Sequence, residues 1–140
     1  MTDDRGAERA TRSELRSAGG SGGAAPPTDC IFCKIVAGEI PADIVYEGER
    51  VIAFRDINAQ APTHVQIIPR AHVAKITEFD AARDTPWLVE LFEAANHIAA
   101  EEGLDKGFRL VFNNGALSGQ SVLHVHMHIL GGRQLGWPPG

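Results

Sequence analysis

The chain has 140 residues, of which 44% are hydrophobic and 22% are charged, and its formal net charge is −5. These values are typical of one soluble globular domain, and no apolar run is long enough to cross a bilayer. The negative charge and the lack of a Lys/Arg cluster argue against nucleic acid as the main partner. The N-terminus lacks the apolar core of a signal peptide, so we expect a cytoplasmic protein that binds neither membranes nor nucleic acid.

The first 28 residues differ in composition from the rest of the chain. A charged start is followed by a segment rich in Gly, Ser, Ala and Pro, which cannot bury a core. Because such segments stay flexible, we predict a disordered tail at residues 1–28 and one folded domain at residues 29–140. A tail that binds a partner is the alternative.

The folded part is expected to begin with a short helix over residues 30–35, capped by Asp29 and ended near Gly38. Three runs of apolar and β-branched residues follow it. They predict strands at residues 44–46, 51–54 and 65–68, of which the first two form a hairpin.

A long helix is expected to open at Thr85-Pro86 and to end at Gly103. Strands at residues 108–112 and 124–130 follow it. This order predicts an α+β fold, with an antiparallel five-stranded sheet and one long and one short helix. The apolar face of the long helix is expected to comprise Leu88, Leu91, Phe92, Ala95, Ile98 and Ala99.

The segment His124-Val125-His126-Met127-His128 carries the strongest functional signal. In a strand, successive side chains point to opposite faces, so the three histidines would share one face. Such a row predicts metal binding, anion binding, or nucleophilic or acid–base chemistry. His126 is central, and a neutral imidazole there can attack phosphorus if its other ring nitrogen donates to a backbone carbonyl.

The loop before the histidine segment is small and polar. It runs from Asn113 to Ser121 and includes Gly119 and Gln120. Backbone N–H groups in such a loop can approach an anion closely, and Gln120, Ser121 and His128 can donate to phosphoryl oxygens. Together with the histidines, the loop predicts a phosphate site.

Cys30-x-x-Cys33 matches half of a zinc site, for which His72 and His124 are the further ligands on offer. A redox pair and two core cysteines are the alternatives. Redox chemistry is the least favoured, because no thioredoxin-like βαβ pattern surrounds the pair.

Several other residues have both a structural and a functional interpretation. His64 is either a structural hydrogen-bonding residue or a member of the site, and Asp56 is either a turn residue or a ligand for ribose hydroxyls. The remaining apolar set either belongs to the core or sandwiches a base; it comprises Ile31, Phe32, Phe54 and Ile57.

Several separate segments, in the same order along residues 29–140, resemble the histidine triad (HIT) family and its nucleotide-binding branch. They are Asp29-Cys-Ile-Phe-Cys-Lys-Ile, Gly38-Glu-Ile-Pro, Ala61-Pro-Thr-His, Ile68-Pro-Arg-Ala-His72, Asn113, Gly119-Gln-Ser-Val, the triad itself and the ending Gly131-Gly-Arg-Gln-Leu-Gly-Trp-Pro-Pro-Gly140.

The resemblance implies a homodimer in which two sheets form one continuous ten-stranded sheet. It also implies hydrolysis of purine nucleoside phosphoramidates to a nucleoside monophosphate and an amine, without an organic cofactor. Related members hydrolyse dinucleoside polyphosphates, but that branch lacks the Trp-Pro-Pro-Gly ending. A nucleotide-binding regulatory or scaffold protein is a third reading, which only the N-terminal tail supports.

By the same resemblance, His126 is the nucleophile and becomes transiently nucleotidylated. His128 and Asn113 hold phosphate oxygens, and Gln120 and Ser121 contact the phosphate and the leaving group. The remaining implied roles are proton relay or orientation by His64 and His124, ribose binding by Asp56, a base pocket of Ile31, Phe32, Ile35, Phe54 and Ile57, and a tail residue, Trp137, that reaches the partner subunit's site.

Animal members of this branch usually lack the Cys-x-x-Cys pair, whereas many bacterial relatives keep it. Here Cys30, Cys33, His72 and His124 are all present, as in zinc-containing members. Zinc held by four protein ligands would be structural. His124 would then not be free to relay protons.

Overall fold

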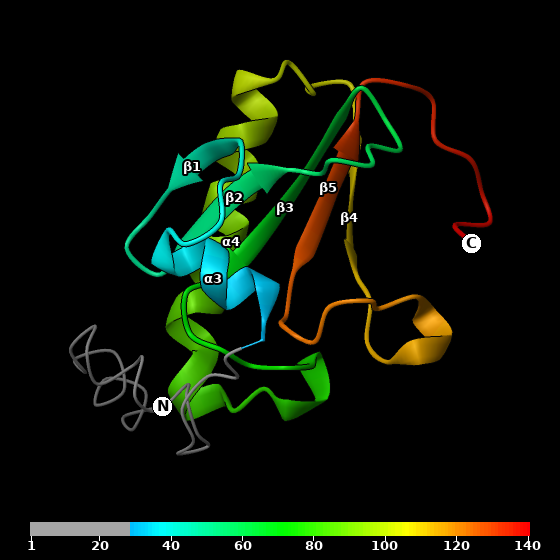
Figure 1. Ribbon diagram of the computed structural model, residues 1–140. Helices are drawn as coiled ribbons and strands as arrows, with labels where there is room; N and C mark the ends of the chain where they lie inside the picture. Colours follow the sequence, from blue (N-terminus) through cyan, green and yellow to red (C-terminus); the bar gives the residue numbers. More distant parts are fainter. Residues whose placement is uncertain (1–28) are drawn as a thin grey trace.

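The computed structural model describes residues 29–140, and the predicted disordered tail lies outside the described residues. Its centre is one five-stranded antiparallel sheet of order β1-β2-β3-β5-β4 (Figure 1). The predicted α+β fold is therefore confirmed. The strands are β1 (Ile44–Glu47), β2 (Val51–Arg55), β3 (Thr63–Pro69), β4 (Phe108–Phe112) and β5 (Met127–Gly131).

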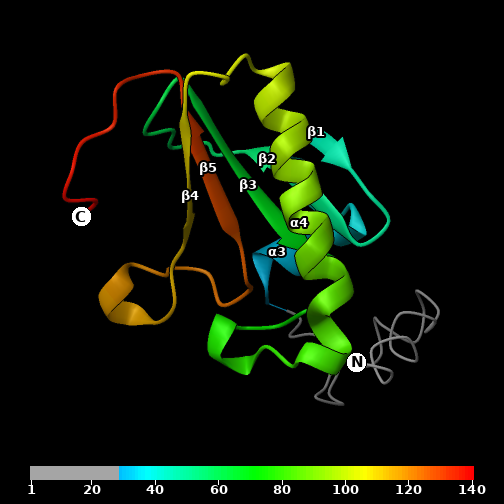
Figure 2. The ribbon, with the colours of Figure 1, turned by 180° about the vertical axis from the view of Figure 1, so that it is seen from behind.

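A helix lies on each face of the sheet. The long helix α4 (Ala81–Glu101) crosses one face, and the short helix α3 (Ile31–Ala37) packs on the other (Figures 1 and 2). No helix in residues 29–140 combines the length and the apolarity that a bilayer span requires. Two short 3₁₀ helices, η1 (Ile76–Glu78) and η2 (Ala116–Ser118), lie in the loops.

Alternation along the central strands sends apolar and polar side chains to different faces. Val65 and Ile67 of β3 and Met127 and Ile129 of β5 join the core beneath α4. Because side chains alternate, the residues next to them in these strands face α3 instead. Among these are His64, Gln66 and His128, so the fold gathers polar side chains on the α3 side of the sheet.

The short helix begins one residue later than predicted and is capped differently. Cys30, not Asp29, is the N-cap, and its sulfur accepts a hydrogen bond from the Cys33 N–H at 3.3 Å. The sulfur atom takes the place of the side-chain oxygen that usually accepts this hydrogen bond. The residue preferences for helix N-caps do not include cysteine, so they did not predict this cap. Gly38 ends the helix with a left-handed conformation, as expected.

The long helix begins at Ala81, four residues before the predicted start at Thr85. The Asp84 carboxylate accepts the N–H of Asp80 at 2.8 Å and so satisfies a donor at the helix start. Pro86 is consequently the sixth residue of the helix and not its first. Proline lacks an N–H, so the prediction treated it as a start signal.

The buried face of α4 differs from the predicted one at Phe92, which is 45% exposed. Trp87 and Ala94 take part in the core instead, beside the correctly predicted Leu91, Ala95, Ile98 and Ala99. The earlier start of α4 does not explain the exposure of Phe92. Phe92 lies on the flank of the stripe, where the sheet does not cover it.

The strand expected at residues 124–130 is shorter, because β5 begins only at Met127. His124 and His126 precede it in a bent segment, yet Val125 is buried in the α4-side core and both histidines face α3 through Phe32. The predicted alternation of faces therefore holds although the regular strand does not extend that far.

Replacing Asp84 with Ala is expected to destabilise the fold strongly. The carboxylate is 1% exposed and accepts hydrogen bonds from the Arg83 guanidinium, the Trp87 indole N–H and the Asp80 N–H. Removing one partner of a buried ion pair costs about 3–5 kcal/mol, here in the free energy of unfolding. Denaturant unfolding measures it, with exposed Asp105→Ala as the control; equal stability of both variants would contradict the assignment.

Candidate active site and metal centre

A cavity of about 530 Å³ opens on the α3 side of the sheet. Polar side chains reach it from β3, β5 and the loops after β2 and before β5, and apolar ones reach it from α3 and β2. Of the residues singled out in the sequence, those lining the cavity are Ile31, Phe32, Ile35, Phe54, Asp56, Ile57, His64, Asn113, Gly119, Ser121, His126 and His128.

The tautomer of His126 follows from its backbone contact. Its Nδ1 lies 2.7 Å from the carbonyl oxygen of His124, and a carbonyl can only accept. Nδ1 therefore carries the proton and Nε2 carries the lone pair. Burial, the largest influence, lowers the pKa of His126, so the ring is neutral near pH 7. A neutral imidazole with a free Nε2 is a nucleophile or general base.

His128 has the opposite tautomer. The Gln60 N–H donates to His64 Nδ1 at 3.0 Å, so the proton of neutral His64 is on Nε2. That N–H lies 2.9 Å from His128 Nδ1, which accepts it. Nε2 of His128 then carries a proton. The rings of His126 and His128, whose centroids are 5.0 Å apart, thus bring a lone pair on His126 Nε2 and a proton donor on His128 Nε2 to the same cavity.

Asp56 lies beside His64 and His128, and two hydrogen-bond donors hold its carboxylate. Its Oδ1 accepts the Asn58 N–H at 2.8 Å, and its Oδ2 accepts the Gln66 side-chain amide at 3.1 Å. Gln66 was not predicted as a site residue. The period of two in β3 places it on the same face as His64, and that spacing was the signal available.

Of the residues predicted for catalysis or nucleotide binding, three do not line the cavity. Gln120 is buried, and its amide binds the backbone of Gly115, Ala74 and Val122. Trp137 is 82% exposed on the C-terminal segment, with the Arg109 guanidinium 5.9 Å from its ring. His124 is fully buried, and only its backbone carbonyl reaches His126.

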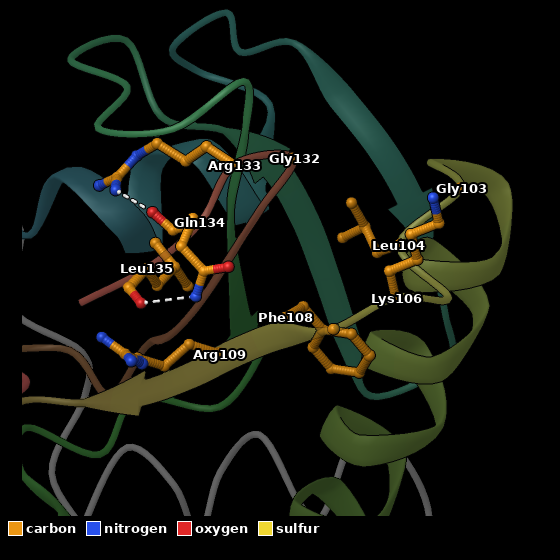
Figure 3. Close-up of a pocket in the computed structure, with 10 residues that line it drawn as sticks. Gly103, Leu104, Lys106, Phe108, Arg109, Gly132, Arg133, Gln134 and Leu135 are labelled. Carbon is orange, nitrogen blue, oxygen red and sulfur yellow. Dashed lines mark hydrogen bonds between the residues drawn. The ribbon is translucent and has the colours of Figure 1, made fainter. Parts of the chain in front are cut away.

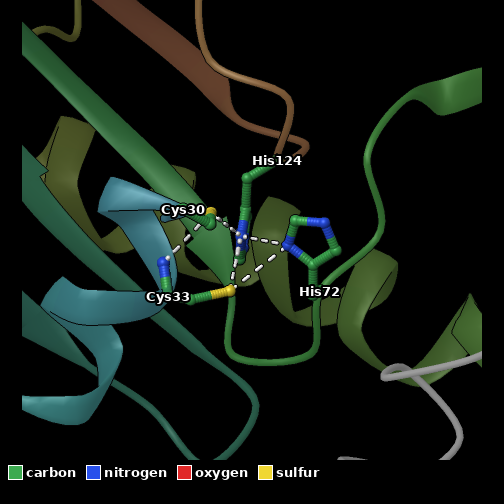
Figure 4. A group of neighbouring side chains, drawn as sticks. All are labelled: Cys30, Cys33, His72 and His124. Atoms are coloured by element: carbon green, nitrogen blue, oxygen red, sulfur yellow. Dashed lines mark hydrogen bonds between the residues drawn. The ribbon is translucent and has the colours of Figure 1, made fainter. Parts of the chain in front are cut away.

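The side chain of His124 belongs to a second cluster, with Cys30, Cys33 and His72 (Figure 4). The four donor atoms lie within 4.8 Å of one another. Nδ1 of His124 is 3.5 Å and 3.6 Å from the two sulfurs and 3.2 Å from His72 Nδ1, which is 3.2 Å from Cys33 Sγ. Around a tetrahedral zinc ion, neighbouring S and N ligand atoms stand roughly 3.3–3.8 Å apart. The cluster therefore fits a metal ion of this type.

Proton positions in the cluster also suit a metal. Nε2 of His124 lies 2.9 Å from the Pro69 carbonyl, so it carries the proton and Nδ1 presents a lone pair to the cluster. The Cys33 thiol, as the largest influence, lowers the pKa of the Cys30 thiol, and the His124 and His72 side chains lower it further, whereas burial opposes them. The same contact raises the pKa of the Cys33 thiol, so a metal would have to displace the Cys33 proton. A thiolate is the metal-binding form of cysteine.

Comparison with known proteins settles the family. A model of the HIT domain matches residues 37–135. The chain belongs to the HIT domain family. It is 47% identical to a 14 kDa zinc-binding protein of Brassica juncea over 113 residues, which cover 80% of this chain and all of that protein.

Solved structures agree with the HIT assignment. A HIT family hydrolase from Legionella pneumophila is 50% identical, with a TM-score of 0.77, and the match covers 80% of this chain and 100% of that one. A histidine triad protein from Clostridium difficile is 42% identical, with a TM-score of 0.74, and the match covers 79% and 96% of the two chains.

A second cavity of the HIT domain, about 510 Å³, lies where β4 begins and β5 ends (Figure 3). Its arginines bind nearby carbonyls. Arg109 donates to Gly136, and Arg133 donates two hydrogen bonds to the Gln60 carbonyl, at 3.1 Å and 3.0 Å. Arg133 thereby fixes the carbonyl group of Gln60. The N–H group of the same residue donates to His64 and so sets the His64 tautomer.

The free energy of unfolding is expected to fall as the pH drops from about 6.5 to 4. Burial, followed by the His126 and His64 charges, lowers the pKa of His128 to about 4. An unfolded histidine, with pKa about 6.5, binds its proton first, so acid favours the unfolded state in this window. Denaturant unfolding at several pH values measures the slope. The slope should be shallower in His128→Asn; an equal slope in both proteins would contradict the shift.

Proposed function

We propose that this HIT protein hydrolyses purine nucleoside phosphoramidates to a nucleoside monophosphate and an amine. The observation that carries the proposal is the pair of opposite tautomers in one cavity, a lone pair on His126 Nε2 and a donor on His128 Nε2. In the proposed first step, the substrate nitrogen takes a proton from solvent, His126 Nε2 bonds to phosphorus, and the bond from phosphorus to that nitrogen breaks, so that a neutral amine leaves; the proton that water loses in the second step returns to solvent. Water then cleaves the nucleotidyl-histidine and regenerates neutral His126.

The walls of the cavity support a nucleoside as the bound group. Phe32 and Phe54, whose ring centroids are 5.3 Å apart, are buried at its apolar end, and Ile31 is 45% exposed there. These side chains can enclose a flat base. Asp56 presents carboxylate oxygens to the same cavity, where they can accept sugar hydroxyls.

Polar groups beside His126 support a phosphoryl group in transfer. In the proposed complex, His128 and Asn113 donate to its non-bridging oxygens, where negative charge develops. Ser121 also lines the cavity and is proposed to contact the leaving nitrogen. We assign Gln120 an indirect role, since its amide holds the loop from Gly115 to Val122 in place.

We further propose that the four-ligand cluster binds zinc. Cys30, Cys33, His72 and His124 would fill all four positions of a tetrahedral site, so the ion would be structural, and relatives carry the name zinc-binding protein. When bound, zinc supplies a cross-link between α3 and the loops before β5 and after β3. His124 then orients His126 through its carbonyl and takes no part in proton relay.

A homodimer is proposed through β4, which has a neighbouring strand on one side only. Phe108, 36% exposed at the start of this edge strand, and Phe92, 45% exposed on α4, leave apolar surface uncovered. Pairing of two β4 edges would give the continuous ten-stranded sheet, with Trp137 near the partner's site. Twice the chain mass in solution supports this, and a monomer excludes it.

The substrate class is tested by rates on two compounds, adenosine monophosphoramidate and a diadenosine polyphosphate. The proposal expects faster turnover of the phosphoramidate, measured as adenosine monophosphate released. Faster cleavage of the polyphosphate would overturn the phosphoramidate assignment in favour of dinucleoside hydrolysis. Binding of the monophosphate without any turnover would indicate a nucleotide-binding role.

A further inference from the structure

Gln66 is a polar residue on the floor of the catalytic cavity that the proposed chemistry does not use. It lies on β3 directly opposite Phe54 of β2 and His128 of β5. Its side chain therefore stands between the apolar end of the cavity and the histidine pair. Its amide nitrogen faces Asp56 Oδ2 at 3.1 Å, which fixes the amide orientation because a carboxylate only accepts.

The position of Gln66 matters because one proton has two acceptors within reach. The Gln60 N–H places the only proton of neutral His64 on Nε2. This nitrogen lies 2.9 Å from His128 Nδ1 and 3.3 Å from Asp56 Oδ2. If the proton goes to His128, Nε2 of His128 must be a donor. If it goes to Asp56, His128 is free to adopt the other tautomer.

We propose that Gln66 is a positioning residue that directs the His64 proton to His128 by occupying Asp56 Oδ2. The Gln66 amide takes one of the two lone pairs of this oxygen and so weakens its competition for the His64 proton; the shorter contact, to His128, then prevails. His128 Nε2 then keeps the proton that stabilises the transferring phosphoryl group, and Asp56 keeps its orientation for the sugar. The consequence for catalysis rests on the proposed function, whereas the proton position does not.

A divalent cation is the competing explanation for this group, since the ligand atoms of Asp56, His64 and His128 lie within 4.8 Å of one another. A metal on His64 Nε2 would require the proton on Nδ1. The Gln60 N–H already points at Nδ1 from 3.0 Å, and two donors there would repel each other. The hydrogen-bond arrangement therefore favours a proton between the histidines over a metal ion.

The direct test is the tautomer of His128 in the full chain, read from imidazole ¹⁵N–¹H correlation spectra. In wild type, Nε2 of His128 should be protonated. In Gln66→Leu, which keeps the size but removes the donor, the other tautomer should appear. In the double variant Gln66→Leu/Asp56→Leu the competing acceptor is gone, so the wild-type tautomer should return. A general packing defect would not be reversed in this way.

Kinetics on adenosine monophosphoramidate provide the second readout. Gln66→Leu should lower kcat at least about tenfold, because the other tautomer should predominate and a donor to the developing charge is then lost in most of the molecules. Gln134→Leu, the same change at an exposed glutamine, should match wild type. Gln66→Met serves as the second variant if the leucine variant fails to fold.

An unchanged His128 tautomer in folded Gln66→Leu or Gln66→Met would overturn the proposal, as would a shifted tautomer that the double variant does not restore. Failure of the proposed function looks different. Wild type would then not release adenosine monophosphate from the phosphoramidate, while the tautomer shift in Gln66→Leu would still be observed.

Discussion

His126→Ala is expected to lower the turnover of adenosine monophosphoramidate by at least about a thousandfold, as loss of a covalent nucleophile does in other enzymes. Among the described residues 29–140, the variant removes the one cavity imidazole whose Nε2 carries a lone pair. Affinity for adenosine monophosphate should stay within a few-fold of wild type, since the apolar walls and Asp56 remain. Steady-state rates and equilibrium binding, measured on the same preparations, separate the two effects.

The matched control for this variant is His97→Ala. His97 is an exposed histidine on α4, on the opposite side of the sheet, where its side chain contacts Glu101 at 3.3 Å. It should retain full turnover. Residual activity of His126→Ala close to that of His97→Ala would rule out a nucleotidyl-histidine at this position and leave His126 with a binding role only.

Cys30→Ser is expected to abolish zinc binding and to destabilise the HIT domain severely. Wild type should contain about one zinc per chain, and the variant close to none. Structural zinc sites contribute a free energy of about 10–16 kcal/mol to folding in small zinc domains, so even half of this is comparable with the about 5–15 kcal/mol by which a typical domain is stable. Metal analysis measures the stoichiometry and thermal unfolding measures the loss.

Both cysteines belong to the cluster, so the control uses the metal instead of a second variant. A chelator should lower the Tm of wild type to that of Cys30→Ser, and added zinc should restore wild type alone. A metal-free chain with an undiminished Tm would contradict a structural zinc. If activity falls in the same proportion as the amount of folded protein, the metal site stabilises the fold and takes no part in the reaction.

The elements that local patterns specify well were predicted well. The alternation of apolar residues along β3 and β5, and their helical spacing along α4, mark the side chains that the core buries. Because burial of these side chains stabilises the three elements, the pattern predicted them. Apart from Phe92, which lies in the middle of α4 and is exposed, the errors lie at the ends of elements, where the contacts of single side chains set the boundary. Asp84 caps α4 from within, and the Cys30 sulfur caps α3, and neither contact leaves a trace in apolar periodicity.

The site could be predicted as a set of residues but not as a set of proton positions. Histidine spacing pointed to His126 and His128, yet spacing is the same for every tautomer. The tautomers depend on the backbone groups of His124 and Gln60, which tertiary structure brings to the rings. Gln66 was overlooked because a glutamine within an apolar strand carries no motif, and its partner Asp56 is on another strand's loop.

The most direct test of the covalent mechanism is a search for the intermediate itself. Wild-type protein mixed with excess adenosine monophosphoramidate should be quenched on the time scale of one turnover, and the mass of the intact chain measured. We expect an adenylyl adduct on His126 that forms and decays no more slowly than kcat, with none on His126→Ala. Turnover without any adduct, or an adduct on another residue, would contradict nucleotidyl transfer through His126.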